Sequence, residues 1–382
     1  MKRQHFFLGG AALSTSLLAK PKPARAVFDY GLTVQRLEAY LNGLCTTHKV
    51  PSASFAVLQN GQIYYGSVGV QSLSSRLPVR WTTCYQACSC SKMFAAITGV
   101  ILAEQGDVKL DGDLTSTLKT LKVPNSSPAG SKPVTLRRLF GMTGGANIHG
   151  YGGYPANVAL PTMTEILNGK PPANSPAVKI VKPPGTVEAY SGGGYELARA
   201  VMQGATNRTL AQLAQGYIFN KLGMTRSGYL YPPETSSGID TAFAYNSSEV
   251  EYGSQFRRYP EQAAAGLWTT PTDFMKFAKG LSASYNGTPG AIMSQQSAQQ
   301  VFKNVDGKGY GIGGALTHKN GIVSYGKDGA NAGYTCYFIL FPAQGKAAAI
   351  MTNSDNGYPL FAPFFQWVTP HFGWPYYPGL AD

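Results

Sequence analysis

Strand-like segments stand near the two ends of this chain and are separated by a long stretch that contains few of them. Near the start, leucines recur at helical spacing over residues 33–48, and segments 53–59 and 62–69 flank an Asn60-Gly61 turn, which predicts a helix and then a β-hairpin. Near the end, the β-rich segments are 322–325, 334–341 and 347–352. Strands so far apart in sequence predict one sheet closed by both ends of the chain.

The middle of the chain, residues 116–255, is rich in Pro, Gly, Asn and Ser and reads as a loop-rich, mainly helical lobe. Before it, the apolar segment 91–105 has no Pro and stops at Gly106, which predicts a buried helix. Shorter helices are expected at 135–140, 195–203 and 272–281. The predicted fold class is α/β (α+β), an antiparallel sheet flanked by terminal helices with an inserted helical lobe. We expect a single two-lobed domain over 27–382, whose α/β lobe comprises 27–115 and 256–382, with the site in a cleft between the lobes.

Residues 1–26 have the order of a cleavable export signal. Two basic residues precede the apolar run 6–18, and a small-residue site follows at 24–26. We expect the mature chain to begin near Val27 and to be periplasmic or secreted. The basic start resembles a twin-arginine signal with one arginine replaced by lysine, so both export routes stay open.

Charge and cysteine content exclude several function classes. The formal net charge of +13 falls to +8 without the five basic residues of 1–26, and no Lys/Arg run suggests nucleic-acid binding. The sequence contains no uncharged apolar run long enough to predict a membrane span. It does not indicate an oligomeric state. The five cysteines are too few and irregular for a disulfide scaffold or a zinc site, so Cys88 and Cys90 are interpreted as small apolar filler.

A hydroxyl and an amine stand three residues apart at Ser89 and Lys92, on one face of the first turn of the predicted buried helix. The N-terminus of that helix would also favour a developing oxyanion. Ser-x-x-Lys spacing recurs at Ser116 and Ser324. Only Ser89 is followed by a long apolar helix that could bury its lysine, so we expect the other two serines to be surface residues.

Segment 87–92, followed by 105–111, resembles the opening of the class C β-lactamase and penicillin-binding protein (DD-peptidase) family, which includes family VIII-type carboxylesterases. Further blocks that resemble this family stand in the same order at 134–139, 143–145, 184–185, 190–191, 194–197, 264–267, 309–313, 326–329 and 333–334. The resemblance covers residues 50–355 and implies a β-lactamase/transpeptidase-like fold.

Carried over residue by residue, the resemblance implies Ser89 as the nucleophile and Lys92 with Tyr190 as the proton-transfer pair. It implies Lys327 as the cation on the strand that lines the site. Two cations beside a phenol would stabilise its phenolate, which makes Tyr190 a plausible base. The oxyanion hole would consist of the backbone N–H groups of Ser89 and Ala330.

The substrate-binding edge would include Asp328 and Gly329, and here the sequence departs from the family pattern. Thr is common at the position of Asp328, and Asn or Ser at that of Gly192. Glycine has no side-chain amide to hydrogen-bond an acylamino group, which weakens the case for β-lactam recognition. Tyr245 also fits the tyrosine motif but lacks the preceding Pro-Gly, and it is kept as the alternative to Tyr190.

These patterns predict a cofactor-free serine hydrolase that works through an acyl-enzyme on small carboxylic esters or D-amino-acid peptides, with esters narrowly preferred. No metal or organic cofactor is implied, and no Gly-x-Ser-x-Gly elbow is present. The alternatives are a β-lactamase, transfer of the acyl group to an alcohol, and a catalytically silent penicillin-binding or peptidoglycan-sensing module.

Overall fold

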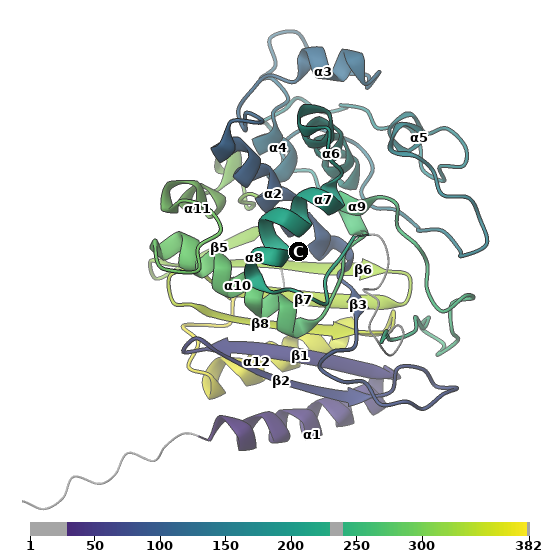
Figure 1. Cartoon of the computed structure of the whole chain (residues 1–382), viewed down its shortest axis with the longest axis vertical. Coiled ribbons are helices and arrows are strands. Elements are labelled where there is room, and N and C mark those ends of the chain that lie inside the picture. Colours follow the sequence, from purple (N-terminus) through teal and green to yellow (C-terminus); the bar gives the residue numbers. More distant parts are fainter. Residues whose placement is uncertain (1–28, 230–239, 380–382) are drawn as a thin grey trace, which may run out of the picture.

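The computed structural model describes residues 29–229 and 240–379. The expected export signal, residues 1–26, lies outside them. Within the described residues, six strands form an antiparallel sheet in the order β2-β1-β8-β7-β6-β5 (Figure 1). The strands are β1 (Ser52–Gln59), β2 (Gln62–Gly69), β5 (Ala315–Lys319), β6 (Ile322–Asn331), β7 (Tyr334–Phe341) and β8 (Lys346–Thr352). The pairing of β1 with β8 confirms a sheet closed by both ends of the chain.

Both faces of this sheet are covered. Every residue of β7 is buried, as expected for a strand that packs on two sides. Tyr337 and Ile339 belong to one apolar cluster, whereas Phe338 and Leu340 belong to a second cluster on the opposite face. The alternation follows from the period of two in a strand, and it explains why the segment is apolar throughout.

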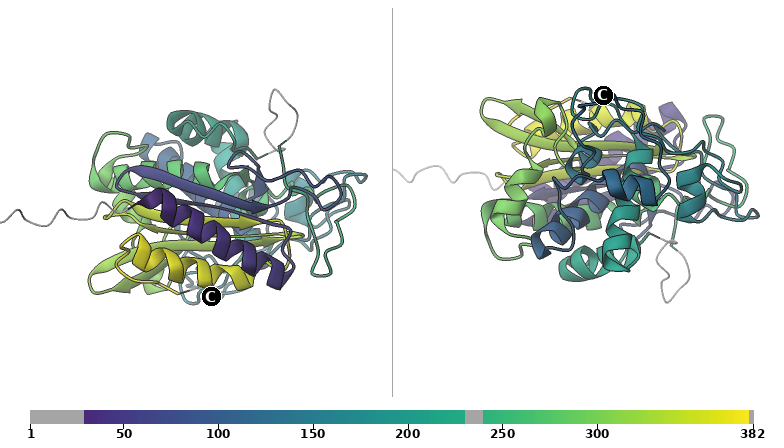
Figure 2. Two further views of the ribbon diagram at one scale, coloured as in Figure 1. Left: turned by 90° about the horizontal axis from the view of Figure 1, so that it is seen from below. Right: turned by 90° about the horizontal axis from the view of Figure 1, so that it is seen from above.

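The two terminal helices, α1 (Tyr30–His48) and α12 (Phe361–His371), lie side by side on one face of the sheet (Figure 2). Leu37 and Leu41 of α1 are fully buried in the same cluster as Phe364 of α12. This arrangement confirms the prediction of a sheet flanked by terminal helices.

The remaining helices lie on the other side of the sheet or beyond its β5 edge (Figure 1). The predicted buried helix is α2 (Ser91–Gln105), which ends at Gly106 with a φ of 87°. Further helices are α3 (Thr115–Thr120), α4 (Leu136–Phe140), α5 (Met163–Asn168), α6 (Gly192–Thr206), α7 (Leu210–Ala214), α8 (Asn220–Leu222), α9 (Gln262–Ala265), α10 (Pro271–Asn286) and α11 (Gln295–Val301). Two short strands, β3 (Tyr85–Gln86) and β4 (Trp268–Thr269), pair separately. In the described parts, no helix has the length and apolarity needed to cross a membrane.

Several elements are longer than the sequence predicts. Helix α6 begins at Gly192 rather than 195 because Ser191 caps it: the Ser191 hydroxyl accepts a hydrogen bond from Gly194 N at 2.9 Å. Strand β6 runs on to Asn331. The expectation that Ser324 is a surface residue is wrong, because the unpredicted strand β5 pairs with β6 and leaves Ser324 buried. The residue limits of the two lobes stay a prediction.

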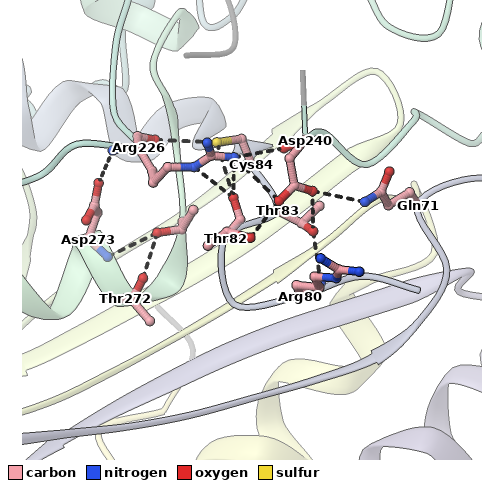
Figure 3. A network of polar contacts seen from close by, with 10 residues as sticks. Gln71, Arg80, Thr82, Thr83, Cys84, Arg226, Asp240, Thr272 and Asp273 are labelled. Atoms are coloured by element: carbon pink, nitrogen blue, oxygen red, sulfur yellow. Dashed lines mark hydrogen bonds and ion pairs between the residues drawn. The ribbon is translucent and has the colours of Figure 1, made fainter. Parts of the chain in front are cut away.

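A polar network holds the segment before β3 to distant parts of the chain (Figure 3). The Asp240 carboxylate accepts hydrogen bonds from Gln71 at 2.9 Å, Thr82 at 2.6 Å and Thr83 at 2.7 Å, and it forms an ion pair with Arg226 at 3.5 Å. The guanidinium also donates to the carbonyl of Thr82. These bonds hold the segment that leads to the nucleophile turn, and the hydrogen bonds from Gln71, Thr82 and Thr83 to Asp240 join residues more than 140 positions apart.

Candidate active site

Ser89 lies in a 3₁₀ turn, η1 (Cys88–Cys90), directly before α2. The preceding residue, Cys88, has a φ of 49°, in the left-handed region that a non-glycine side chain rarely occupies. Its thiol is fully buried and donates to the carbonyl of Gln86 at 3.3 Å. Ser89 is the one member of the turn that is not buried. The turn therefore exposes its serine while the flanking thiols fill the space beneath it.

Strand β6 approaches this turn so closely that only glycine fits at one position. A Cβ atom on Gly329 would lie 2.6 Å from Ser89 N and 2.8 Å from Cys88 Cβ. The Cys90 thiol donates to the carbonyl of Lys327 at 3.0 Å and adds a second tie between the turn and the strand. Ala330, the next residue on β6, is exposed and lines the same cleft as Ser89. The two residues expected to supply oxyanion N–H groups thus stand on adjoining segments.

Lys92 projects from the first turn of α2 and is only 1% exposed. Its ammonium donates to Ser89 Oγ at 3.2 Å and to the carbonyl of Ala264 in α9 at 2.8 Å. Because both bonds converge on one nitrogen, α9 determines where the ammonium sits relative to the serine hydroxyl.

Helix α9 is itself held by a buried ion pair. The Glu196 carboxylate accepts a hydrogen bond from Ala264 N at 3.0 Å, and Arg199 binds the other carboxylate oxygen at 2.9 Å. Arg199 also donates to the carbonyl of Pro260 at 2.7 Å. The two charges therefore position the segment that carries the Lys92 acceptor.

Tyr190 lies between two ammonium groups. The centroid of its ring is 4.8 Å from Lys92 Nζ and 4.9 Å from Lys327 Nζ. Burial alone would raise the pKa of the phenol, but the charges of both lysines and hydrogen bonding with Ser89 and Lys92 outweigh it, so the pKa of Tyr190 is below its ordinary value. A phenol with a lowered pKa beside a serine hydroxyl can accept and return a proton.

Lys327 is 3% exposed and forms an ion pair with its neighbour Asp328 at 2.7 Å. The second carboxylate oxygen of Asp328 accepts a hydrogen bond from Tyr358 at 2.8 Å. Burial opposes the charge on Lys327, but Tyr190, Tyr310 and Asp328 raise the pKa of the lysine well above its usual range. Burial likewise opposes ionisation of Asp328, yet Lys327 and Tyr358 keep the pKa of this carboxyl below its ordinary value.

These side chains open into one cleft of about 250 Å³. All the site residues predicted from the sequence line this cleft: Ser89, Lys92, Tyr190, Lys327, Asp328, Gly329 and Ala330. His149, Tyr151, Tyr310 and Tyr358 also line it and were not predicted. The glycine-rich run 144–153 around His149 and Tyr151 was a signal of a loop that approaches another backbone closely.

The departure at Gly192 has a structural reason. A Cβ atom there would lie 3.1 Å from the Tyr151 ring and 3.2 Å from the carbonyl of His149. Segment 149–151 thus packs against the start of α6, and its aromatic side chains line the cleft where a larger residue at position 192 would compete with them.

The alternative tyrosine is placed elsewhere. The Tyr245 hydroxyl accepts a hydrogen bond from Leu73 N at 2.8 Å, its ring is buried, and it does not line the cleft that contains Ser89. Of the two tyrosine motifs, the structure therefore brings Tyr190 and not Tyr245 to the nucleophile turn.

All five cysteines are free and buried. Cys336 of β7 lies under the turn, where its thiol donates to the carbonyl of Ala87 at 3.0 Å and lies 3.4 Å from the sulfur of Cys90. Burial raises the pKa of the Cys90 thiol. Across residues 29–229 and 240–379, no three His, Cys, Asp or Glu side chains cluster as a metal site would require.

A hydroxyl, two buried lysines and a phenol in one cleft beside an antiparallel sheet define the class of serine hydrolases with the β-lactamase/transpeptidase fold. The family model described as Beta-lactamase matches residues 33–363. The chain belongs to the Beta-lactamase family, and it is a serine hydrolase.

Relatives of known name agree with this membership. The chain is 24% identical to "Penicillin-binding protein 4" of Amycolatopsis lactamdurans, over 89% of each sequence. It is also 24% identical to a "D-aminopeptidase" of Gluconobacter oxydans, over 83% of this chain but only 58% of that protein.

Two solved structures share the fold. The octameric penicillin-binding protein homologue from Pyrococcus abyssi is 22% identical, with a TM-score of 0.71 over 88% of this chain and 77% of that one. SurE is 20% identical, with a TM-score of 0.69 over 92% of this chain and 78% of that one.

Proposed function

We propose that this protein hydrolyses small carboxylic esters or D-amino-acid peptides through an acyl-enzyme on Ser89. The observation that carries the proposal is the placement of Tyr190 between Lys92 and Lys327, with Lys92 Nζ 3.2 Å from the Ser89 hydroxyl. A serine hydroxyl is a weak nucleophile, and this arrangement supplies the adjacent base that it needs.

In the acylation half of the reaction, Ser89 Oγ attacks the acyl carbon while its proton passes to the Tyr190 oxygen, assisted by Lys92. The negative charge that develops on the carbonyl oxygen is stabilised by the N–H groups of Ser89 and Ala330. Tyr190 then gives its proton to the departing alcohol or amine, and the acyl group stays bonded to Ser89.

In the second half, the same groups act on water. Tyr190 takes a proton from the water molecule, whose oxygen attacks the acyl carbon, and the proton returns to Ser89 Oγ as the carboxylic acid leaves. Lys327 keeps a positive charge beside the phenolate in both halves. An alcohol that replaced water would yield a new ester instead.

Two observations support esters and D-peptides as substrates. One relative is named a D-aminopeptidase, and a solved neighbour of this fold is described in complex with D-Leu. Position 192 offers no side-chain amide for an acylamino group, which favours small esters. β-Lactam hydrolysis and a silent penicillin-binding or peptidoglycan-sensing module are the alternatives.

Covalent labelling tests the nucleophile. A fluorophosphonate should add one label per chain by intact mass, and Ser89→Ala should abolish both labelling and turnover because it removes only the attacking oxygen. Ser116→Ala is the matched control, since Ser116 is an exposed serine with the same spacing to a lysine. Labelling that persists in Ser89→Ala would overturn the assignment.

Turnover then separates the candidate functions. Rates with p-nitrophenyl esters, D-Ala-D-Ala peptides and nitrocefin would rank esterase, peptidase and β-lactamase activity. A protein that is labelled on Ser89 but turns over none of them would be the silent binding module.

We also propose that the protein is exported and that its mature form begins near Val27. The support is the charged, apolar and small-residue order of residues 1–26. N-terminal analysis of protein recovered outside the cytoplasm of an exporting host would test this, and an intact Met1 would contradict it.

A further inference from the structure

We propose that Asp328 makes the cleft select by charge, so that the enzyme accepts neutral or cationic acyl groups and disfavours those that carry a carboxylate. This inference rests on the proposed function and specifies the substrate class of the same site. It makes Asp328 a specificity residue, held in place by Tyr358.

The geometry places a carboxylate in front of the lysine. The side chain of Lys327 is 4% exposed and that of Asp328 is 23% exposed, and their charged atoms are 2.7 Å apart. Asp328 is therefore the member of the pair that solvent in the cleft can reach. An approaching substrate meets the carboxylate before it can meet the ammonium.

Tyr358 fixes this orientation from outside the strand. It lies in the 3₁₀ turn η4 (Tyr358–Leu360), and its hydroxyl donates to Asp328 Oδ2 at 2.8 Å while Lys327 occupies Oδ1. With both oxygens bound, the carboxylate cannot rotate away without breaking a charge-assisted hydrogen bond.

The charges of the cleft cancel when the enzyme is ready to react. Among the described residues that line it, Lys92 and Lys327 are the lysine or arginine cations and Asp328 is the carboxylate. Deprotonation of Tyr190 adds the second negative charge. His149 is the remaining side chain with basic character; it is exposed, and its ring centroid lies 4.7 Å from that of Tyr190. Among the described lining residues, no further buried lysine or arginine is left to balance a carboxylate on the substrate.

The other lining groups do not supply a positive charge either. Tyr151, Tyr310 and Tyr358 are phenols whose pKa values are raised, chiefly by burial, so they stay neutral at physiological pH. Their rings present apolar and π-electron surface, which suits an alkyl or ammonium group better than a carboxylate. An anionic acyl group would lose its hydration and gain repulsion from Asp328.

The test uses three p-nitrophenyl esters that differ in one terminal group. The first is p-nitrophenyl hydrogen adipate, whose far end is a carboxylate. The second is its methyl ester, whose far end is neutral. The third is a p-nitrophenyl ester of a linear acid of similar length whose far end is a trimethylammonium group. We expect the wild type to show a kcat/KM at least about tenfold lower for the anionic ester than for its methyl ester, because Asp328 repels the carboxylate. A tenfold ratio corresponds to a difference of about 1.4 kcal/mol in transition-state stabilisation.

Asp328→Asn keeps the shape of the side chain and should reduce that preference by about tenfold or more. Tyr358→Phe frees the carboxylate and should change the ratio less, in the same direction. Asp107→Asn is the matched control: it removes one acidic charge from an exposed residue outside the cleft, and its ratio should equal that of the wild type.

Each outcome decides the matter. A wild type that treats the anionic and neutral esters alike, or an Asp328→Asn ratio equal to that of the wild type, would overturn the inference. If Asp328→Asn does not fold, Asp328→Ser and the wild-type ratio provide the same test. Turnover of none of the three esters would overturn the proposed esterase function, and this inference with it, whereas turnover without charge preference would overturn this inference alone.

Discussion

Replacing Tyr190 by phenylalanine removes one oxygen from the cleft and leaves the ring between the two lysines. The ring keeps its contacts with the Lys92 and Lys327 ammonium groups, at 4.8 and 4.9 Å from its centroid, so the fold should be retained. The lost oxygen is the group whose pKa those lysines lower. General acid–base catalysis contributes about 10² to 10⁴ in rate, so we expect kcat on a p-nitrophenyl ester to fall by that factor. This equals about 2.7 to 5.4 kcal/mol of transition-state stabilisation.

The matched control is Tyr245→Phe, which removes the oxygen of the second tyrosine motif. That hydroxyl accepts a hydrogen bond from Leu73 N, so the variant should lose at most about 1 to 3 kcal/mol of stability and keep its kcat. Steady-state rates and thermal unfolding of both variants provide the comparison. A Tyr190→Phe enzyme with near-native kcat/KM would refute the role of the phenol, and an exchange of the two phenotypes would assign it to Tyr245.

Three other substitutions test the electrostatics and the scaffold. Lys327→Met removes a cation that lowers the pKa of Tyr190, so the pH at which kcat/KM rises should move upward; an unmoved profile would argue against a phenolate base. Burial raises the pKa of Glu261 from 4.5 to about 8, and the stability that its protonated form contributes is present below pH 4.5 and lost as the pH rises through about 8. Glu261→Gln should therefore flatten the fall in unfolding free energy over that pH window, measured by urea denaturation, and an unchanged slope would contradict it. Asp240→Ala leaves the partly buried partners of its carboxylate unpaired and should lower the unfolding free energy by about 3 kcal/mol in the same assay, whereas a loss below about 0.5 kcal/mol would show that the network is dispensable.

The fold was predictable to the extent that it rests on local periodicity. The limits of α2 follow from an apolar run and a C-terminal glycine, and the first hairpin follows from an Asn-Gly turn, so both were predicted nearly to the residue. Strand β5 (Ala315–Lys319) was not predicted because its sequence is short and mostly polar, with Thr, His and Lys in its last three positions. Only Leu316 of this strand is buried. Its existence depends on pairing with β6, which no short window of sequence records.

Within the cleft, too, residues that are close in sequence were predicted more readily than residues brought together by tertiary packing. Ser89 in the turn η1 and Lys92 in the first turn of α2 are three residues apart, and Lys327 to Ala330 lie on one strand, so short-range spacing brings each set together. Tyr190 required the further observation of a Pro-Gly turn before it. Tyr245 fits the same short motif without that Pro-Gly, and the tertiary structure places its hydroxyl against Leu73 N, outside the cleft.

The residues that surround the substrate are held by partners from distant segments, unlike the reacting groups, which follow short sequence motifs. Tyr358 acts on Asp328 across 30 positions of sequence, through a turn whose place is set by the packing of α12 on the sheet. No spacing connects the two residues, so the sequence could show that Asp328 departs from the family pattern but not what holds its carboxylate. A family motif therefore predicts which atoms react, whereas the charge that the substrate meets depends on partners supplied by unrelated segments. The Lys327–Asp328–Tyr358 contact is thus the place where this chain differs in charge from the pattern that it resembles.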